Sequence, residues 1–322
     1  LFLGHVGDVE LGASALAGIW FLAIYMLGFG FSLGLQVVIA RRNGEQQYAE
    51  TGKTFFQGLF FLLILAVLLC LLSKIFSPVL LKHLITSDDV YNAVIRYLDW
   101  RIWGLLFSFP FLALRSFLVG ITQTKALNMA AFTAVLMNIP MNWLLIFGLD
   151  MGISGVAIAS SFAEMCSLAV LAAYMFRHID KKAYGLYWHI DITILKEVFS
   201  ISVWSMLQFF TSVAIWFLFF VAIERLGETE LAVSNIVRSV SALFSVIVNA
   251  LAGVTGSLVS NLIGAGEKKQ VFPLCHKIIR LGYAIGIPLI VFALFFHQHI
   301  IGAYTENPAI IQLAWPPFLV ML

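Results

Sequence analysis

The sequence has few charged residues for its length. Asp, Glu, Lys and Arg make up 11% of the 322 residues, whereas 61% are hydrophobic. A soluble domain carries about 25% charged residues, and the 29 Phe and 8 Trp would leave a soluble fold too little polar surface. The composition therefore excludes an ordinary soluble protein and predicts an integral membrane protein. The net charge of +2 gives no reason to expect a nucleic-acid partner.

Cysteine pairs and common catalytic motifs are also missing. Cys70, Cys166 and Cys275 stand alone in apolar surroundings, so they predict neither a disulfide nor a metal framework. The sequence has no P-loop and no visible means of using ATP. It has no His-Glu-x-x-His motif and no Gly-x-Ser-x-Gly motif. We therefore expect a protein that is not an enzyme and needs no cofactor.

Long apolar runs dominate what is present. A helix that crosses a bilayer needs roughly 20 mostly apolar residues. Polar turns separate eight complete candidates, at 11–40, 54–76, 102–121, 127–148, 153–176, 197–223, 231–263 and 274–296. A partial helix ends at Leu3 and another begins near Ile311, so we expect an internal fragment of a longer chain. Inside the first span, the glycines of Gly28–Gly34 favour close helix packing.

Two stretches about 220 residues apart resemble one another. Each is an acidic turn, a long apolar run and a Gly-Glu exit. The openings are Gly7-Asp8-Val9-Glu10-Leu11 and Gly227-Glu228-Thr229-Glu230-Leu231, and Ser14 matches Ser234. With a two-residue insertion, the later matches pair Gly34, Val37, Gly44 and Glu45 with Gly256, Val259, Gly266 and Glu267. Six spans separate the copies, so both enter the membrane from the same side. We predict two homologous six-helix bundles, as parallel repeats around a central cavity.

Positive charge is unequal between the two sets of loops. One set holds twelve Lys and Arg residues, namely Arg41, Arg42, Lys53, Lys125, Arg177, Lys181, Lys182, Lys196, Lys268, Lys269, Lys277 and Arg280. The opposite side, counting interface positions, holds five, namely Lys74, Lys82, Arg96, Arg101 and Arg225. The remaining two, Arg115 and Arg238, lie within spans. The positive-inside rule places the first set in the cytoplasm.

The longest polar stretch separates the two predicted bundles. Residues 181–196 form a cytoplasmic linker between an N-terminal bundle, 1–180, and a C-terminal bundle, 197–322. The linker region contains Tyr184, Tyr187 and Trp188, which we expect at the level of the lipid headgroups.

Glu164 is the sharpest candidate for function. It lies near the middle of the span 153–176, where an isolated carboxylate is strongly destabilised. It should therefore be protonated, paired or bound to an ion. One hypothesis is a cation or proton site, including Na⁺, that faces a cavity. The other is a structural carboxyl group bonded to a neighbouring helix.

Three further groups inside spans are polar. Asn138 and Asn142 lie one helical turn apart on either side of Pro140. Because Pro140 cannot donate to the carbonyl group of Leu136, the helix should kink and leave an acceptor free. This favours either an ion or substrate surface or a simple packing kink. Arg238 lies about 12 Å inside its helix, where it either lines an outer cavity or pairs with a carboxylate. For Arg115 we favour a side chain that reaches to the interface.

The sequence resembles a known transporter family. The stretches Asn138–Gly148 and Met151–Ser160 are similar to the fifth-to-sixth helix signature of multidrug and toxic compound extrusion (MATE) transporters. Leu114–Thr124 resembles the end of that family's fourth helix, and Phe2–Gly12 the exit of its first. The resemblance covers the whole chain. It implies twelve helices in two lobes, of which helices two to nine are complete here, and export of cationic amphipathic compounds in exchange for Na⁺ or H⁺.

The sequence also departs from that family. Some members carry an Asp where this chain has Asn142, so the resemblance favours the NorM-like branch. That branch usually has a carboxylate in its seventh helix, where Gln208 is here the nearest large polar group. The acidic residues that the resemblance implies for the first and tenth helices would lie just before Leu1 and just after Leu322. Glu164 is the one deep carboxylate in the sequence.

These observations predict a multi-pass protein of the cell membrane that acts as an efflux antiporter by alternating access. Its partners should be small amphipathic cations and membrane lipid, and the transport unit should be a monomer. A lipid-linked oligosaccharide flippase of the same superfamily is the nearest alternative, although just two Arg residues in spans weigh against a strongly cationic cavity. An integral-membrane enzyme is a further alternative, but its catalytic groups would gather at one membrane face.

Overall fold

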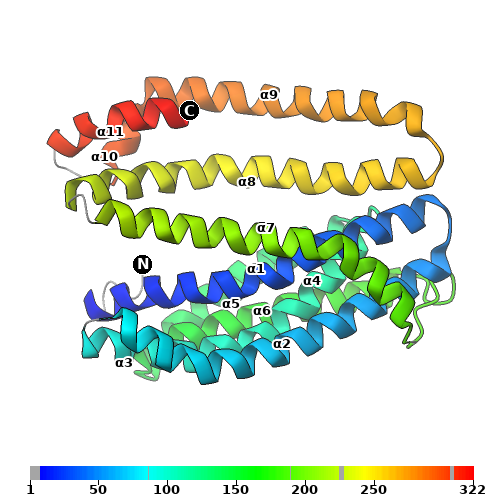
Figure 1. Cartoon of the computed structure of the whole chain (residues 1–322), viewed down its shortest axis with the longest axis horizontal. Helices are drawn as coiled ribbons and strands as arrows, with labels where there is room; N and C mark the ends of the chain where they lie inside the picture. The colour runs from blue at the N-terminus through cyan, green and yellow to red at the C-terminus, as the bar shows by residue number, and fades with distance from the viewer. Residues whose placement is uncertain (1–7, 86, 189, 225–227, 305–307) are drawn as a thin grey trace. The chain divides into compact units, whose positions relative to one another are not determined.

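The computed structural model describes residues 8–85, 87–188, 190–224, 228–304 and 308–322. All regular elements in these ranges are helices, as Figure 1 shows, which confirms the all-α prediction. The packing of Cα atoms divides the chain into two compact units, Leu1–Thr211 and Ser212–Leu322.

The first unit contains six helices and the start of a seventh. These are α1 (Asp8–Gly44), α2 (Tyr48–Leu84), α3 (Asp88–Arg101), α4 (Leu105–Gly120), α5 (Lys125–Trp143), α6 (Gly152–His178) and the first part of α7 (Ile192–Glu224). A 3₁₀ turn, η2 (Ile102–Gly104), joins α3 to α4, and a π-helical turn, η3 (Leu144–Gly148), follows α5. The second unit contains the rest of α7, α8 (Glu228–Gly264), η4 (Lys268–Gln270), α9 (Val271–Phe295), α10 (His297–Gly302) and α11 (Pro308–Met321).

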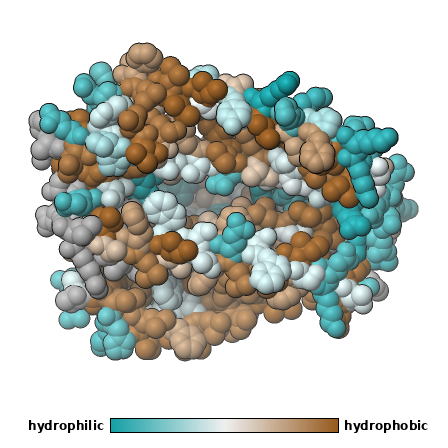
Figure 2. All heavy atoms as spheres, turned by 45° about the horizontal axis from the view of Figure 1, so that its top comes forward, coloured by the Kyte–Doolittle hydropathy of each residue, from teal (hydrophilic) through white to brown (hydrophobic). Residues whose placement is uncertain are grey.

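Within the described ranges, eight helical segments are long and apolar enough to cross a membrane, as predicted. They are Gly12–Gly44, Tyr48–Leu84, Asp88–Gly120, Lys125–Gly148, Gly152–His178, Ile192–Trp216, Ile236–Gly264 and Lys268–Phe295. Apolar side chains cover much of the face in Figure 2, and hydrophilic ones are densest at one end of the helices. The chain is therefore a multi-pass membrane protein.

The third span begins earlier than the predicted 102. Ser87 caps α3 by accepting a hydrogen bond from the backbone N–H of Val90 (3.5 Å), and Asp88 and Asp89 occupy its first turn, where carboxylates stabilise a helix. The placement of Arg101 at an interface outside the spans is therefore wrong. Arg101 lies inside the Asp88–Gly120 segment and is buried.

Close approach through glycine holds the first unit together. A Cβ atom on Gly28 would lie 2.5 Å from the Phe109 ring of α4, and one on Gly30 would lie 2.6 Å from the Met206 backbone of α7. The side chain of Phe109 is fully buried in this core. Lipid supplies little hydrophobic drive between helices, so such van der Waals contact stabilises the bundle. The packing role predicted for Gly28–Gly34 is confirmed.

The segment between α6 and α7 docks on the first unit. The Tyr184 ring lies 5.3 Å from the Tyr48 ring of α2 and 5.7 Å from the Phe117 ring of α4. Gly52 faces the Tyr184 carbonyl oxygen with no room for a Cβ atom. Burial, and to a smaller extent Tyr48, raise the pKa of the Tyr184 hydroxyl above its ordinary value.

Helix boundaries in the two halves of the chain recur at one interval of 220 residues. The helix α1 runs from Asp8 to Gly44, and α8 runs from Glu228 to Gly264, both 37 residues long. The next helical segments begin at Tyr48 and Lys268, and the following ones at Asp88 and Pro308. This constant interval supports the predicted repeat, although Gly7 and Gly227, at its openings, lie outside the described residues.

The predicted two-residue insertion is wrong. The backbone N–H of Gln46 donates to the carbonyl group of Asn43, and that of Gly266 donates to Ile263. Both Gln46 and Gly266 have positive φ, at 59° and 79°. The two exit turns are thus equivalent at the same interval of 220, and the Gly-Glu pairs that suggested an insertion occupy different places in them.

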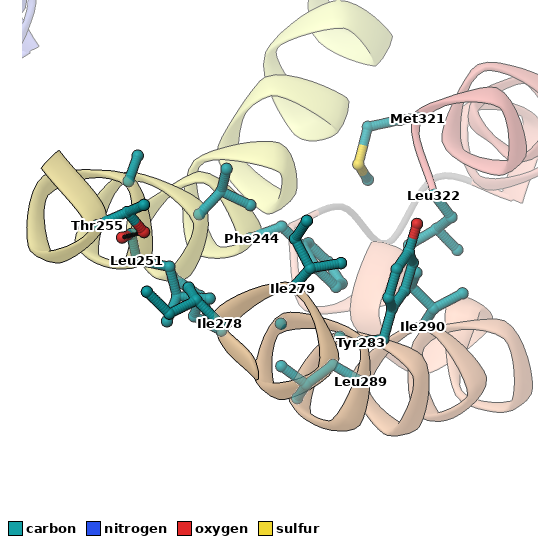
Figure 3. A pocket seen from close by; sticks show the side chains of 15 residues that line it. Phe244, Leu251, Thr255, Ile278, Ile279, Tyr283, Leu289, Ile290, Met321 and Leu322 are labelled. Atoms are coloured by element: carbon teal, nitrogen blue, oxygen red, sulfur yellow. Dashed lines mark hydrogen bonds between the residues drawn. The ribbon is translucent and has the colours of Figure 1, made fainter. Parts of the chain in front are cut away.

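The second unit has a largely apolar groove. It has a volume of about 600 Å³ and lies between α8 and α9, beside the end of α11. Figure 3 shows Phe244 and Leu251 of α8, Tyr283 of α9, and Met321 and Leu322 near the chain end.

Candidate ion and cargo site in the first unit

A buried ion pair joins α3 to α6. Arg101 Nη2 lies 2.5 Å from Glu164 Oε1, and Arg101 Nη1 lies 3.0 Å from Glu164 Oε2. Both guanidinium nitrogens thus donate to both carboxylate oxygens, which is the strongest geometry for this pair. The Arg101 side chain is 11% exposed and that of Glu164 is 27% exposed. Of the states predicted for Glu164, the structure shows the paired one.

The surroundings of the pair are shaped to hold it. The guanidinium carbon of Arg101 lies 3.7 Å from the centre of the Phe21 ring of α1, a cation–π contact. Arg101 also interacts with the buried Tyr97 of its own helix. A Cβ atom on Gly104, in the η2 turn, would overlap Arg101 Nη1 and lie 2.8 Å from Glu164 Oε2. The glycine therefore leaves the space that the ion pair fills.

Two cavities meet at the ion pair. The larger, about 510 Å³, is lined by Arg101 and Glu164 together with the aromatic side chains Phe21, Tyr25, Tyr97 and Phe111. The smaller, about 350 Å³, is lined by Arg101, Glu164, Asn138, Ser160 and apolar residues of α5 and α6. The first unit thus offers an aromatic chamber and an amide-lined chamber with one charged pair between them.

The Asn138–Asn142 pair lies on α5, beside the smaller cavity. Asn142 is 5% exposed, and its Nδ2 donates to Asn138 Oδ1 at 2.9 Å and to the Asn138 carbonyl oxygen at 2.8 Å. Asn142 Oδ1 is buried and has no hydrogen-bond partner in the described part of the chain. The helix α5 passes through the exposed Pro140 and becomes π-helical at Leu144–Gly148.

The other predicted site residues lie elsewhere. Gln208 is exposed on α7 and lines neither cavity. Arg238 is exposed on α8, in the second unit. Arg115 lies 5.7 Å from the centre of the Phe29 ring, with its Nη1 buried and without a hydrogen-bond partner among the described residues. The structure therefore brings Glu164, Asn138 and Asn142 together and separates them from Arg238.

Sequence reasoning missed the partner of Glu164. Arg101 and the aromatic residues Phe21, Tyr25 and Tyr97 were not predicted as site residues. A basic residue at the polar end of a span is typical of the membrane interface, so the sequence held no local signal that Arg101 turns inward. The amphipathic pattern of 88–101, continued into an apolar run, was the available clue that the helix begins earlier.

No group of three or more His, Cys, Asp or Glu side chains in the described ranges is placed to hold a metal ion. All three cysteines are free thiols, as predicted. A bundle of membrane-spanning helices with a duplicated helix pattern and a deep ion pair beside cavities is the architecture of a secondary transporter.

Family comparison identifies this transporter more closely. The MatE family model matches residues 1–144 and 205–322, and the chain therefore belongs to the MatE family. This is a family of multidrug efflux transporters and not of enzymes. The chain is 25% identical to a probable multidrug resistance protein NorM of Shewanella oneidensis, over 97% of this chain and 69% of that protein. It is 22% identical to multidrug resistance protein NorM of Vibrio cholerae, over 98% of this chain and 70% of that protein.

Solved structures show the same fold. The outward-facing conformation of a MATE multidrug resistance transporter superposes with a TM-score of 0.87 and 20% identity, over 99% of this chain and 71% of that one. The eukaryotic MATE transporter AtDTX14 superposes with a TM-score of 0.84 and 19% identity, over 99% of this chain and 72% of that one.

Proposed function

We propose that this protein exports amphipathic cationic compounds in exchange for Na⁺ or H⁺ by alternating access of two lobes around a central cavity. The observation that carries the proposal is the deep Glu164 carboxylate, which is shared by an aromatic and an amide-lined chamber. The relatives named multidrug resistance proteins support the choice of cargo. Transport in this proposal uses an ion gradient and no cofactor, and the transport unit is a monomer in the cell membrane.

The larger cavity suits flat organic cations. The faces of Phe21, Tyr25 and Tyr97 carry negative quadrupole potential, which attracts a delocalised positive charge. The Arg101–Glu164 pair adds no net charge to the cavity, so it does not repel cations as an unpaired arginine would. A free cationic cavity, which a pyrophosphate-linked lipid would need, is not what these residues form.

The smaller cavity suits a coupling ion. Asn142 Oδ1 is an unbonded buried acceptor next to Asn138, and amide and carboxylate oxygens are ligands for hard cations. In this proposal Asn138, Asn142 and Glu164 form the ion-linked site, with Pro140 and the π-helical turn shaping the helix beside it. Gln208 and Arg238 belong to cargo surfaces outside this site.

The test is ethidium efflux from pump-deficient cells that express the protein from its complete gene. Efflux should depend on Na⁺ in a comparison with K⁺, or a protonophore should abolish it. Asn138→Ala and Asn142→Ala should reduce the rate and its ion dependence. Asn128→Ala, at an exposed position of the same helix, is the matched control and should leave both unchanged.

Two outcomes would contradict the proposal. A well-expressed and correctly inserted protein without efflux of any tested cation would favour another cargo, such as a lipid-linked oligosaccharide. Efflux that needs neither Na⁺ nor a proton gradient would exclude the antiport mechanism.

A further inference from the structure

We propose that Arg101 is a tethered cation that occupies Glu164 between transport events, and that a transported cation binds the carboxylate by displacing it. This inference rests on the proposed function, because it concerns the same carboxylate. It adds an internal competitor that sets the affinity of the site for external cations.

The geometry of the resting state supports the competition. A bidentate guanidinium at 2.5 and 3.0 Å uses both oxygens of Glu164, so no carboxylate oxygen is left without a cationic partner. An external cation that coordinates this carboxylate must therefore replace at least one of the two contacts. Because charges in a low-dielectric interior interact strongly, simultaneous binding of two cations at one carboxylate is unfavourable.

The pair is also reachable. Glu164 is 27% exposed on its side chain, against 11% for Arg101, so the carboxylate is the more open partner. It lines the aromatic cavity and the amide-lined cavity at once. Either an organic cation from the first or a small ion from the second can thus approach the same oxygens.

Arg101 has somewhere to remain when it is displaced. Its guanidinium group already lies 3.7 Å from the centre of the Phe21 ring and interacts with Tyr97. These contacts stabilise the positive charge after the carboxylate is taken by another cation. Displacement therefore needs a small shift of the guanidinium group over Phe21, with no expulsion of the arginine from the bundle.

The repeat within the chain provides an internal comparison. The position 220 residues after Arg101 is Met321, near the end of α11, and Met321 lines the apolar groove of the second unit. The helix α11 forms and packs against α8 without an arginine there. A helix of this kind therefore does not need the ion pair to pack, which favours a role for Arg101 at the carboxylate itself.

The experiment measures cation binding to the purified protein by calorimetry, with Na⁺ and tetraphenylphosphonium as separate probes and choline as the ionic-strength control. Arg101→Gln should bind at least one probe about tenfold more tightly or better, because apparent affinity rises as the binding-competent fraction rises. Arg101→Gln combined with Glu164→Gln should lose this gain. Arg96→Gln, at an exposed position of the same helix, should bind as the wild type does.

Arg101→Lys keeps the proposal testable if Arg101→Gln does not fold. Lysine keeps the charge but loses the bidentate contact, so a smaller gain in affinity is expected. If the folded variants bind both probes no more tightly than the wild type, Arg101 is a structural partner and the inference is overturned. A gain in binding without ethidium efflux would sink the proposed function alone, and efflux without the gain would sink the competitor alone.

Discussion

Gly104 leaves the space that the Arg101–Glu164 pair occupies, and it does so from the turn that joins α3 to α4. A Cβ atom there would overlap Arg101 Nη1. Gly104→Ala should therefore lower the free energy of unfolding by roughly 1–3 kcal/mol, the usual cost of overpacking. Thermal melting in detergent checks this. Gly12→Ala, where no atom lies within 4 Å of the added Cβ, is the control, and equal melting of the two variants would refute the tight fit.

The ion pair should behave differently when one partner or both are removed. Glu164→Gln leaves the Arg101 guanidinium buried without its counter-charge, and we expect a loss of roughly 2 kcal/mol. This is below the ~3–5 kcal/mol of a fully buried pair because Glu164 is partly exposed. The double variant Arg101→Gln and Glu164→Gln should melt closer to the wild type. A double variant less stable than Glu164→Gln would show that the charge imbalance is not the cause.

At the residue scale, the sequence was sufficient for Glu164 and insufficient for its partner. A lone carboxylate in an apolar span is informative by itself, since its desolvation must be compensated. The compensating group lies 63 positions away in the chain, and a single sequence does not reveal which basic residue reaches it. The close contact of Asn142 with Asn138 follows from their spacing on a helix, whereas the buried and unbonded Asn142 Oδ1 depends on tertiary packing.

Among the elements, the segment between α6 and α7 is more firmly attached than a polar linker suggests. Tyr184 fits between α2 and α4, and its raised pKa keeps the hydroxyl neutral well into alkaline solution. The sequence placed aromatic residues of this segment at the headgroup level by composition alone. Their docking depends on Gly52, a glycine inside α2 that no local pattern marks as a contact point.

Removing the Tyr184 ring should release this segment. Tyr184→Ala loses both aromatic contacts, worth roughly 2 kcal/mol at a half-buried position. Trypsin should then cleave after Lys181 and Lys182 roughly 10–30 times faster, because local opening becomes more frequent. Tyr184→Phe keeps the ring and should be cleaved at nearly the wild-type rate. Equal cleavage of the Ala and Phe variants, measured in inside-out vesicles, would argue against docking by this ring.

For the molecule as a whole, hydropathy was enough to find all eight spans, because each must satisfy its backbone hydrogen bonds within an apolar solvent. The repeat was found from few identities, and the assumed insertion came from matching glycines by name. The structure instead matches backbone geometry. Gln46 and Gly266 share a positive φ although their residue types differ, and turns of this kind tolerate such exchange better than packed helix faces do.

The interval of 220 residues predicts that equivalent helix ends lie on the same side of the membrane. Single cysteines at Gln47 and Glu267, in a background without Cys70, Cys166 and Cys275, should react with an impermeant maleimide only in inside-out vesicles. Cysteines at Asp89 and Ala303, at the other ends of the spans, should react in intact cells. Six spans between the copies require this pattern, since an even number of crossings returns the chain to its starting side. Labelling of Gln47 and Glu267 from opposite sides would mean an odd number of crossings between them, and the two halves would then be inverted repeats, with a different geometry of alternating access.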